Sequence, residues 1–441
     1  MLDRKTAPAI HAIERIQLIQ ANESQLDNGI SVGLINAGTQ ELVRVELLFP
    51  GGIWFQQKPL QASLTNAMLE EGTKNRKAIQ IADEVDYYGA FLELEIGQDW
   101  SSVVLYTLKK HLDKVLPVIE DVVKNPIFQQ EELDIMLQNR KQSYQVDIQK
   151  VAYLARTRFA TLLFGAQNPY ANPLELVDFD QIKREDLMAF FVKHYSAQNC
   201  RIIVAGKVDE LVVKLLNKHF GGKDWQHAGS PVLEALTMNA AAQTSNGIVI
   251  PKFAASAREN FIPKADAVQS GIRIGRALFN KLHADYHPFK VLSTVLGGYF
   301  GSRLMNNIRE DKGYTYGIGS RVISMQQGGY FFISTEVGVG VCKPALTEIY
   351  KELALLRNEK VSAEELELVK TYMIGDFIRS VDGPFALADK YKKIKVYGLG
   401  YDYYDRFVDN ISGCTAQQLL DLANKYLQQD DLLELVAGQM Q

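Results

Sequence analysis

Apolar and polar positions along this chain follow two periods, which predict strands and helices in turn. Alternating apolar residues mark strands such as VRVELLF and RIIVAG, and amphipathic spacing marks helices such as REDLMAFFVKHY. FLELEIGQDWSSVVLYTL and RVISMQQGGYFFISTEV are each typical of a β-hairpin, and each leads into a long helical stretch. Strands that alternate with long helices predict an α+β fold, in which helices cover one face of each sheet.

The order of these patterns occurs twice. Near residue 200 and again at the C-terminus, an amphipathic helix is followed by a polar turn and an apolar strand that ends in Val-Ala-Gly. Upstream, each copy has a strand and then a helix. Pro59 and Pro288 suit the first turns of these helices, and Gly72 and Gly297 suit the positions that follow them. The chain is therefore expected to contain two homologous halves.

The two halves are expected at residues 1–226 and 248–441, joined by a linker at 227–247 that is rich in Ala, Ser, Asn and Gly. A further division near Leu163 and near Asp376 would give each half two related α/β layers, with a mostly antiparallel sheet covered by helices on one face.

Composition fits a soluble globular protein, with 47% hydrophobic and 23% charged residues among 441 and a net charge of −4. This balance predicts no binding to nucleic acid or membrane. The densest basic patch runs from Lys390 to Lys395 around Tyr391 and is expected to be a solvated helix face. The chain is predicted to be cytoplasmic, because it has only three, distant cysteines, no apolar leader and no run of 18 apolar residues.

Two local patterns imitate known sites. His283 and His287 stand four residues apart in HADYH, but Pro288 follows at once, so we expect a surface turn before a helix rather than a metal site. Gly338 and Gly340 lie between a strand and a helix, yet the preceding strand belongs to a hairpin, which argues against dinucleotide binding.

The most informative stretch is VLGGYFGSRLMNNIREDKGYTYGIGS, residues 295–320. A helix is expected to end at Gly297, a second helix to run from about Ser302 to Asp311, and a strand to follow with Tyr314 and Tyr316 on one face. Arg309 offers a planar fork of donors for a carbonyl or carboxylate. A tyrosine hydroxyl can donate to an oxygen that gains charge. The plainer interpretation is a capping arginine and two packed tyrosines.

This stretch resembles the C-terminal half of pitrilysin/insulinase-type zinc metallopeptidases, the inverzincins. The family pattern of a Gly-rich turn, Ser-Arg-Leu, Leu-Arg-Glu, Gly and Tyr is matched by Gly297-Gly298, Ser302-Arg303-Leu304, Ile308-Arg309-Glu310, Gly313 and Tyr316. The resemblance covers nearly the whole chain. It implies half of a metallopeptidase clamshell, in which Arg309 and Tyr316 hold the substrate backbone beside zinc.

The family's zinc helix carries H-x-x-E-H ahead of a Gly-Thr pair, which here is Gly72-Thr73. The three active positions then fall on Ser63, Asn66 and Ala67, none of which can serve as a zinc ligand or general base of the usual kind. The family's glutamate ligand would fall at residues 143–147, SYQVD, where Asp147 is the only carboxylate. The chain is therefore expected to bind no metal.

Some members of this family are pairs of separate chains, one with zinc and one with the Arg–Tyr pair. The resemblance implies that this chain is the non-catalytic subunit, without a cofactor of its own. Its expected partners are a zinc-bearing H-x-x-E-H subunit and an unstructured peptide. The alternative is a structural or peptide-binding homologue with no peptidase role, possibly a homodimer that adds peptide strands to a sheet edge.

Overall fold

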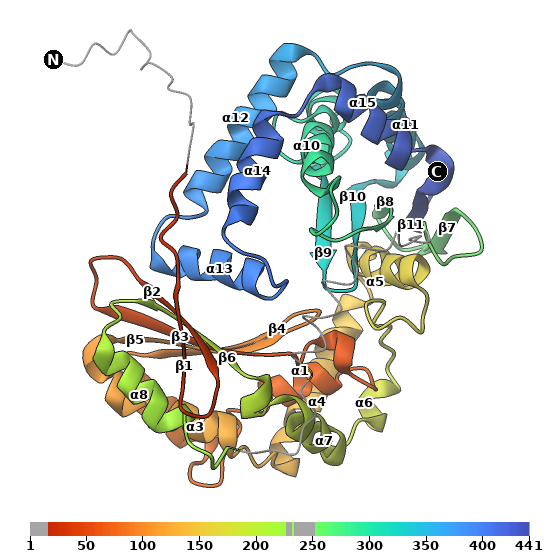
Figure 1. The fold of residues 1–441 in the computed structure, drawn as a ribbon. Coiled ribbons are helices and arrows are strands. Elements are labelled where there is room, and N and C mark those ends of the chain that lie inside the picture. Colours follow the sequence, from red (N-terminus) through yellow and green to blue (C-terminus); the bar gives the residue numbers. More distant parts are fainter. Residues whose placement is uncertain (1–15, 226–231, 233–251, 441) are drawn as a thin grey trace, which may run out of the picture.

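The computed structural model describes residues 16–225, 232 and 252–440, so the predicted linker at 227–247 lies outside the described residues except for Val232. Its strands form two mixed sheets (Figure 1). The first sheet contains β1 (Asn22–Gln25), β2 (Ser31–Asn36), β3 (Leu42–Phe49), β4 (Phe91–Ile96), β5 (Ser101–Leu108) and β6 (Arg201–Gly206). The second contains β7 (Glu259–Pro263), β8 (Gln269–Leu278), β9 (Ile318–Met325), β10 (Gly328–Gly338) and β11 (Leu433–Gly438).

The two sheets repeat one topology, which confirms the predicted α+β fold with two related halves. The first has the order β1-β2-β6-β3-β5-β4 and the second the order β7-β11-β8-β10-β9. In each, one pair is parallel, β2 with β6 and β7 with β11, and the other neighbours are antiparallel. The Val-Ala-Gly strands β6 and β11 take the same place. The exact domain limits stay a prediction.

Each sheet has a main layer of helices. The first half contributes α1 (Gln61–Ala67), α2 (Ala78–Tyr87), α3 (Leu112–Lys124), α4 (Gln130–Asp147), α5 (Val151–Phe164), α6 (Asp178–Gln181), α7 (Arg184–His194) and α8 (Glu210–Phe220). The second contributes α10 (Tyr286–Gly297), η4 (Met305–Asp311), α11 (Cys342–Asn358), α12 (Ala363–Arg379), α13 (Pro384–Lys395), α14 (Asp402–Ser412) and α15 (Ala416–Tyr426). Two apolar cores lie between these layers and their sheets. None of the described helices is both long and apolar enough to cross a membrane.

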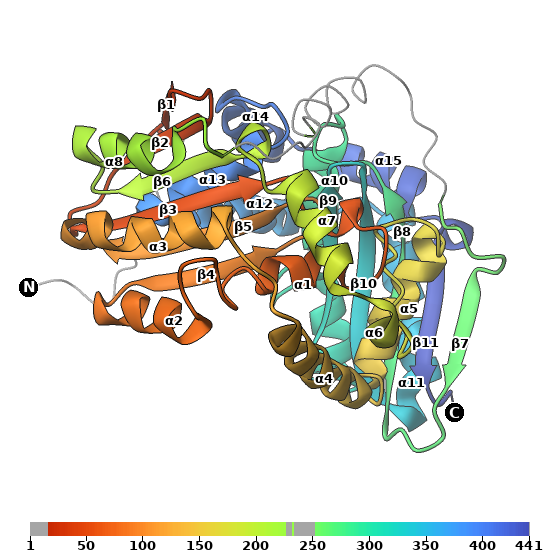
Figure 2. The ribbon, with the colours of Figure 1, turned by 90° about the horizontal axis from the view of Figure 1, so that it is seen from below.

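The two halves exchange one helix each across the opposite faces of their sheets. Helix α5, from the first half, packs on β8 and β11 through Phe159 and Leu163. Helix α13, from the second half, packs on β2 and β6 through Leu387 and Tyr391. Figure 1 shows α13 lying over the first sheet and α5 beside the second, and Figure 2 shows α5 beside the second sheet from below. The exchange adds a third layer to what the hydrophobic pattern predicts.

A buried charged network holds α13 on the first sheet. Glu46 of β3 is fully buried and accepts hydrogen bonds from Ser102 at 2.7 Å and from Lys392 of α13 at 2.8 Å. Arg44, also buried, pairs with Glu46 at 2.8 Å and with Asp389 of α13 at 2.7 Å. The two pairs with α13, Glu46–Lys392 and Arg44–Asp389, connect residues more than 300 positions apart in the sequence, so the two halves depend on each other for charge compensation.

The lysine stripe at residues 390–395 therefore differs from the expected solvated face. Lys392 is held by Glu46, and Lys395 pairs with Glu23 of β1 at 2.6 Å. Tyr391 is buried against Gly33 of β2, where a Cβ would lie only 2.3 Å from the tyrosine ring. The stripe was interpreted as solvated because its own sequence does not reveal that a sheet from the other half lies against it.

Two helix boundaries also differ from the prediction. Helix α1 begins at Gln61, not at Pro59, because Leu60 adopts a left-handed conformation with φ of 69°. It ends at Ala67, five residues before Gly72. Pro288 does lie in the first turn of α10, and Gly297 is the last residue of that helix.

Candidate functional site

The segment that carries Arg309 is an irregular helix at the end of the second apolar core. The predicted helix over 302–311 is present, but Met305–Asp311 is wound as a π-helix, η4. Its apolar side is anchored by Leu304 and Ile308, which are both fully buried. Such π-turns are rare and are found preferentially at functional sites, because they reposition side chains that a regular helix would point elsewhere.

The guanidinium of Arg309 lies at the surface of this helix. It stands 4.5 Å from the centre of the Phe300 ring and 3.0 Å from a carboxylate oxygen of Glu310. Its side chain is 31% exposed, and Phe300 is 65% exposed. Stacking on an aromatic face orients the planar fork and leaves donors available for a carbonyl or carboxylate ligand. Arg303, by contrast, is structural, because it binds both oxygens of Glu365 on α12.

Tyr316 lies in a loop and not in a strand, because β9 begins only at Ile318. The expectation that Tyr314 and Tyr316 share a strand face is therefore wrong. Thr315 fixes this loop: its hydroxyl donates to the Glu336 carbonyl of β10 at 2.7 Å. Tyr314 packs against the second core, whereas the side chain of Tyr316 is 95% exposed. The loop thus presents one tyrosine to solvent on an anchored backbone.

The three positions of the degenerate zinc motif lie together in α1. Ser63 donates its hydroxyl to the Leu60 carbonyl at 3.1 Å. Asn66 is buried and donates its amide to the hydroxyl of Tyr195 at 3.1 Å. Ala67 contributes only a methyl group. These side chains are engaged in packing and internal hydrogen bonds, which suits a core helix.

The sequence analysis missed one residue that contacts the degenerate zinc motif, Arg140. Arg140 of α4 donates from Nη1 to the hydroxyl of Ser63 at 3.0 Å and from Nη2 to its carbonyl at 3.4 Å. Burial lowers the pKa of Arg140, yet an arginine stays charged in proteins. A guanidinium thus touches the first of the three positions. The side chains around Ser63 do not fit a divalent cation.

The window at residues 143–147, where a third ligand was sought, does not face α1. Tyr144 donates to the Leu174 carbonyl, and Asp147 pairs with Lys150 at 2.7 Å. The side chain that reaches α1 is Arg140, one helical turn before Tyr144. Across the described residues, no group of three or more His, Cys, Asp or Glu side chains is arranged to hold a metal ion.

The HADYH pattern is only partly a surface turn. His283 lies in the exposed turn, as expected, but His287 is the second residue of α10 and is 6% exposed. Its ring lies 4.9 Å from that of Tyr403 and 5.4 Å from that of Phe407. Burial, with repulsion from Lys290, Arg406 and Lys281, lowers the pKa of His287 to about 4. His287 is a neutral core residue.

We expect the chain to lose stability as the pH falls from 6.5 to about 4. In the unfolded state His287 takes up a proton near its ordinary pKa of 6.5, whereas the folded state resists protonation down to about 4. The stabilisation is fully present above pH 6.5 and is lost on acidification, by up to about 3 kcal/mol. Urea unfolding at several pH values measures it. In His287→Phe the slope over this range should be shallower; an unchanged slope would contradict the assignment.

Comparison with known proteins finds a family match for the region that contains the Arg309 segment. Residues 181–373 match the family described as Peptidase M16 inactive domain. This part of the chain is similar to a peptidase M16 inactive domain. A solved structure described as the peptidase M16 inactive domain from Pseudomonas fluorescens has the same fold, with a TM-score of 0.81 and 22% identity over 96% of this chain and 98% of that one.

The sequence relatives of this chain include proteins named as proteases and a protein named as a non-peptidase. An "Uncharacterized zinc protease" from Rickettsia bellii is 26% identical, over 79% of this chain and 81% of its own length. A "Non-peptidase homolog YmxG" from Helicobacter pylori is 25% identical, over 75% and 74%. Human "Cytochrome b-c1 complex subunit 1, mitochondrial" is 25% identical, over 52% and 48%. These comparisons confirm the inferred resemblance to M16-type zinc metallopeptidases.

Proposed function

We propose that this chain is the non-catalytic subunit of a cytoplasmic, two-chain zinc metallopeptidase. In this proposal it binds no metal. Its partner is a chain of the same family with an intact H-x-x-E-H motif and the zinc, and together they enclose an unstructured peptide. The observation that carries the proposal is the display of Arg309 and Tyr316 on one anchored segment, while a guanidinium lies against the degenerate zinc helix.

Each of the two exposed side chains has a role in this proposal. The zinc of the partner would supply an activated water for attack on the scissile carbonyl. Arg309, held in orientation by Phe300, would bind the substrate backbone through its planar donors. The hydroxyl of Tyr316 would donate to the oxygen that gains negative charge. Thr315 already holds the backbone of this loop, so only the side chain of Tyr316 has to become ordered when substrate binds.

Substitution of either residue tests the proposal in the reconstituted pair. Removing one donor to a developing oxyanion typically lowers kcat by about 10²-fold. We therefore expect Tyr316→Phe to reduce kcat by about that factor with KM changed less. Arg309→Ala removes a contact to the substrate backbone and should lower kcat/KM mainly through a higher KM. Cleavage in the parent pair should stop when a chelator is added. The measurement is steady-state hydrolysis of an unstructured fluorogenic peptide, and the partner to co-express is a similar-sized chain with an intact H-x-x-E-H motif.

Two surface variants serve as matched controls. Tyr87→Phe removes the hydroxyl of another tyrosine that is 83% exposed, and Arg406→Ala removes an exposed arginine of α14. Both should cleave at the parent rate. Size-exclusion chromatography should show that all four variants still form the pair. Equal turnover by Tyr316→Phe, Arg309→Ala and the controls would refute the role in catalysis.

A second candidate is a structural or peptide-binding homologue with no peptidase role. It is supported by the names of the Helicobacter and human relatives and by two sheet edges, at β4 and β9, that lack a neighbouring strand among the described residues. Such edges can accept a peptide as an added strand. This candidate is favoured if a homodimer binds peptides but no combination with an H-x-x-E-H chain cleaves them.

A further inference from the structure

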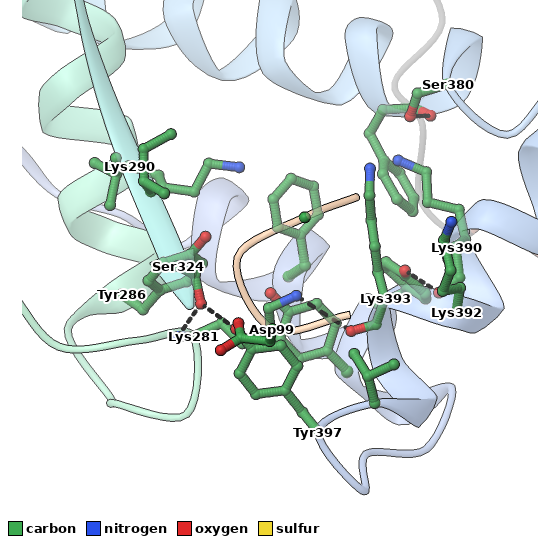
Figure 3. Close-up of a pocket in the computed structure, with 18 of the residues that line it drawn as sticks. Asp99, Lys281, Tyr286, Lys290, Ser324, Ser380, Lys390, Lys392, Lys393 and Tyr397 are labelled. Carbon is green, nitrogen blue, oxygen red and sulfur yellow. Dashed lines mark hydrogen bonds between the residues drawn. The ribbon is translucent and has the colours of Figure 1, made fainter. Parts of the chain in front are cut away.

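A large cavity lies between the two halves of the molecule, away from the Arg309 segment. Its volume is about 1050 Å³. One wall comes from the turn between β4 and β5, and the others come from α10, β9, α12, α13 and α14. Figure 3 shows the side chains of Lys290 and Lys393 extending toward the centre from opposite sides. None of the residues assigned to substrate binding or to the degenerate zinc motif lines this space.

The wall of this cavity carries more positive than negative groups. The acidic and basic lining residues, tyrosines apart, are the acids Glu95, Asp99 and Asp376 and the bases Lys281, Lys290, Lys390, Lys392 and Lys393. Lys392 is already neutralised, because its ammonium lies 2.8 Å from Glu46 and 3.6 Å from Glu95. We call the other four lysines the lysine cluster.

The remaining acids are also engaged. Asp99 accepts a hydrogen bond from the hydroxyl of Tyr170 at 2.5 Å and another from the backbone amide of Gln326 at 3.0 Å. Asp376 pairs with Arg379 at 2.6 Å. The lysine cluster is therefore only weakly compensated by the carboxylates around it.

Aromatic rings, not carboxylates, provide the close contacts of this cluster. The ammonium of Lys281 lies 4.3 Å from the ring centre of Tyr397 and donates to the Lys393 carbonyl at 3.2 Å. Lys290 lies 5.5 Å from the ring of Phe407, and Lys390 lies 5.1 Å from that of Phe377. A cation–π contact orients an ammonium without neutralising its charge.

The cluster is electrostatically unfavourable when the cavity holds only water. Burial, reinforced by repulsion from the other lysines, lowers the pKa of Lys281 to about 7 and that of Lys390 to about 8. The pKa of Lys290 is also lowered by these two causes, and the attraction of Asp376 offsets only part of this decrease. A multiply charged anion in the cavity would remove this repulsion and restore the protons.

We propose that this cavity is a binding site for a small compound that carries a compact polyphosphate group, held by Lys281, Lys290, Lys390 and Lys393. Phosphate matches the cluster because several negative charges lie close together on such a group, and lysine binds phosphate as a point charge. The ligand would bridge α10 and α13, the helix that lies over the first sheet in Figure 1. This site is independent of the proposed peptidase role.

Calorimetric titration of the full chain with sodium tripolyphosphate tests the proposal. We expect binding of one anion per chain, weakened as salt is raised from about 0.05 M to about 0.2 M, since screening shortens the range of the attraction. In Lys290→Gln/Lys393→Gln the affinity should fall about tenfold or more, because two charge contacts to the anion are lost. The control Lys214→Gln/Lys218→Gln removes two exposed lysines of α8 and should leave affinity unchanged.

Thermal unfolding gives a second readout. Without tripolyphosphate, Lys290→Gln/Lys393→Gln should melt at or above the temperature of the parent, because repulsion is relieved. With tripolyphosphate, the parent and the α8 control should gain stability and the cavity variant should not. If the double variant fails to fold, the single variant Lys393→Gln, at an exposed position, takes its place in the titration and the melting experiment. Absence of binding, equal weakening in the α8 control, or preference for a glutamate-rich peptide over tripolyphosphate would each overturn the proposal.

Discussion

A variant with Ser63→His, Asn66→Glu, Ala67→His and Arg140→Glu is expected to bind one zinc ion per chain, and the parent is expected to bind none. The first three changes rebuild H-x-x-E-H on α1. The fourth replaces the guanidinium that now donates to Ser63 at 3.0 Å. Glutamate is shorter than arginine, but histidine reaches further than serine, so the two side chains can still meet. Two imidazoles and a carboxylate form a common zinc ligand set.

The triple variant that keeps Arg140 is the decisive control. The fixed positive charge of Arg140 beside the two imidazoles repels a divalent cation and so weakens zinc binding at this site. We expect a dissociation constant of about 1 µM or below for the quadruple variant, equivalent to about 8 kcal/mol, and no stoichiometric zinc in the triple variant. Elemental analysis after dialysis measures both. Equal zinc in the two proteins would show that Arg140 does not control the site.

Replacing Glu46 by glutamine is expected to destabilise the fold by about 3–5 kcal/mol, because it leaves the buried Arg44 and the half-buried Lys392 without their main carboxylate. The pKa of Arg44 is raised in spite of the strong opposing effect of its burial, and Glu46 is the largest source of that increase. The loss should be visible as a lower midpoint in urea unfolding at neutral pH.

Glu95→Gln is the matched control for this second experiment. Glu95 is 42% exposed on the side chain and lies 3.6 Å from the same Lys392, so its removal should cost no more than about 1 kcal/mol. A loss in Glu46→Gln that is no larger than in Glu95→Gln would mean that the buried network contributes little. In that case α13 would be held on the first sheet mainly by apolar contacts such as those of Leu387 and Tyr391.

The parts of the fold that could be predicted are those encoded by local periodicity. The hairpins, α10 and α15, and the twofold order of elements follow from apolar spacing that the structure preserves, because neighbouring positions decide which face is buried. The Arg309 segment was found for a related reason: its glycines and Ser-Arg-Leu triplet form a contiguous pattern. Only the placement of Tyr316 failed, since a loop anchored by Thr315 leaves no periodic signal.

The parts that could not be predicted depend on contacts between distant segments. Arg140 lies 77 positions after Ser63, and a search by spacing alone missed it by about one helical turn. Lys390 and Lys393 were visible as a basic stripe. The lysine cluster also needs Lys290 of α10 and Lys281 of the loop before α10. No local rule links those residues, because tertiary packing and not propensity brings them together.

The exchange of α5 and α13 has a consequence for how the protein is made. On the ribosome, the first sheet can form once β6 has emerged, but the face formed by Ile35, Ile203 and Ala205 stays bare until Leu387 and its neighbours are synthesised. At about 5–20 residues per second, that is a wait of roughly ten seconds or more. During this interval the newly made N-terminal half exposes this apolar sheet face, which can aggregate or bind chaperones. Chaperone dependence should accordingly be concentrated in the middle of translation.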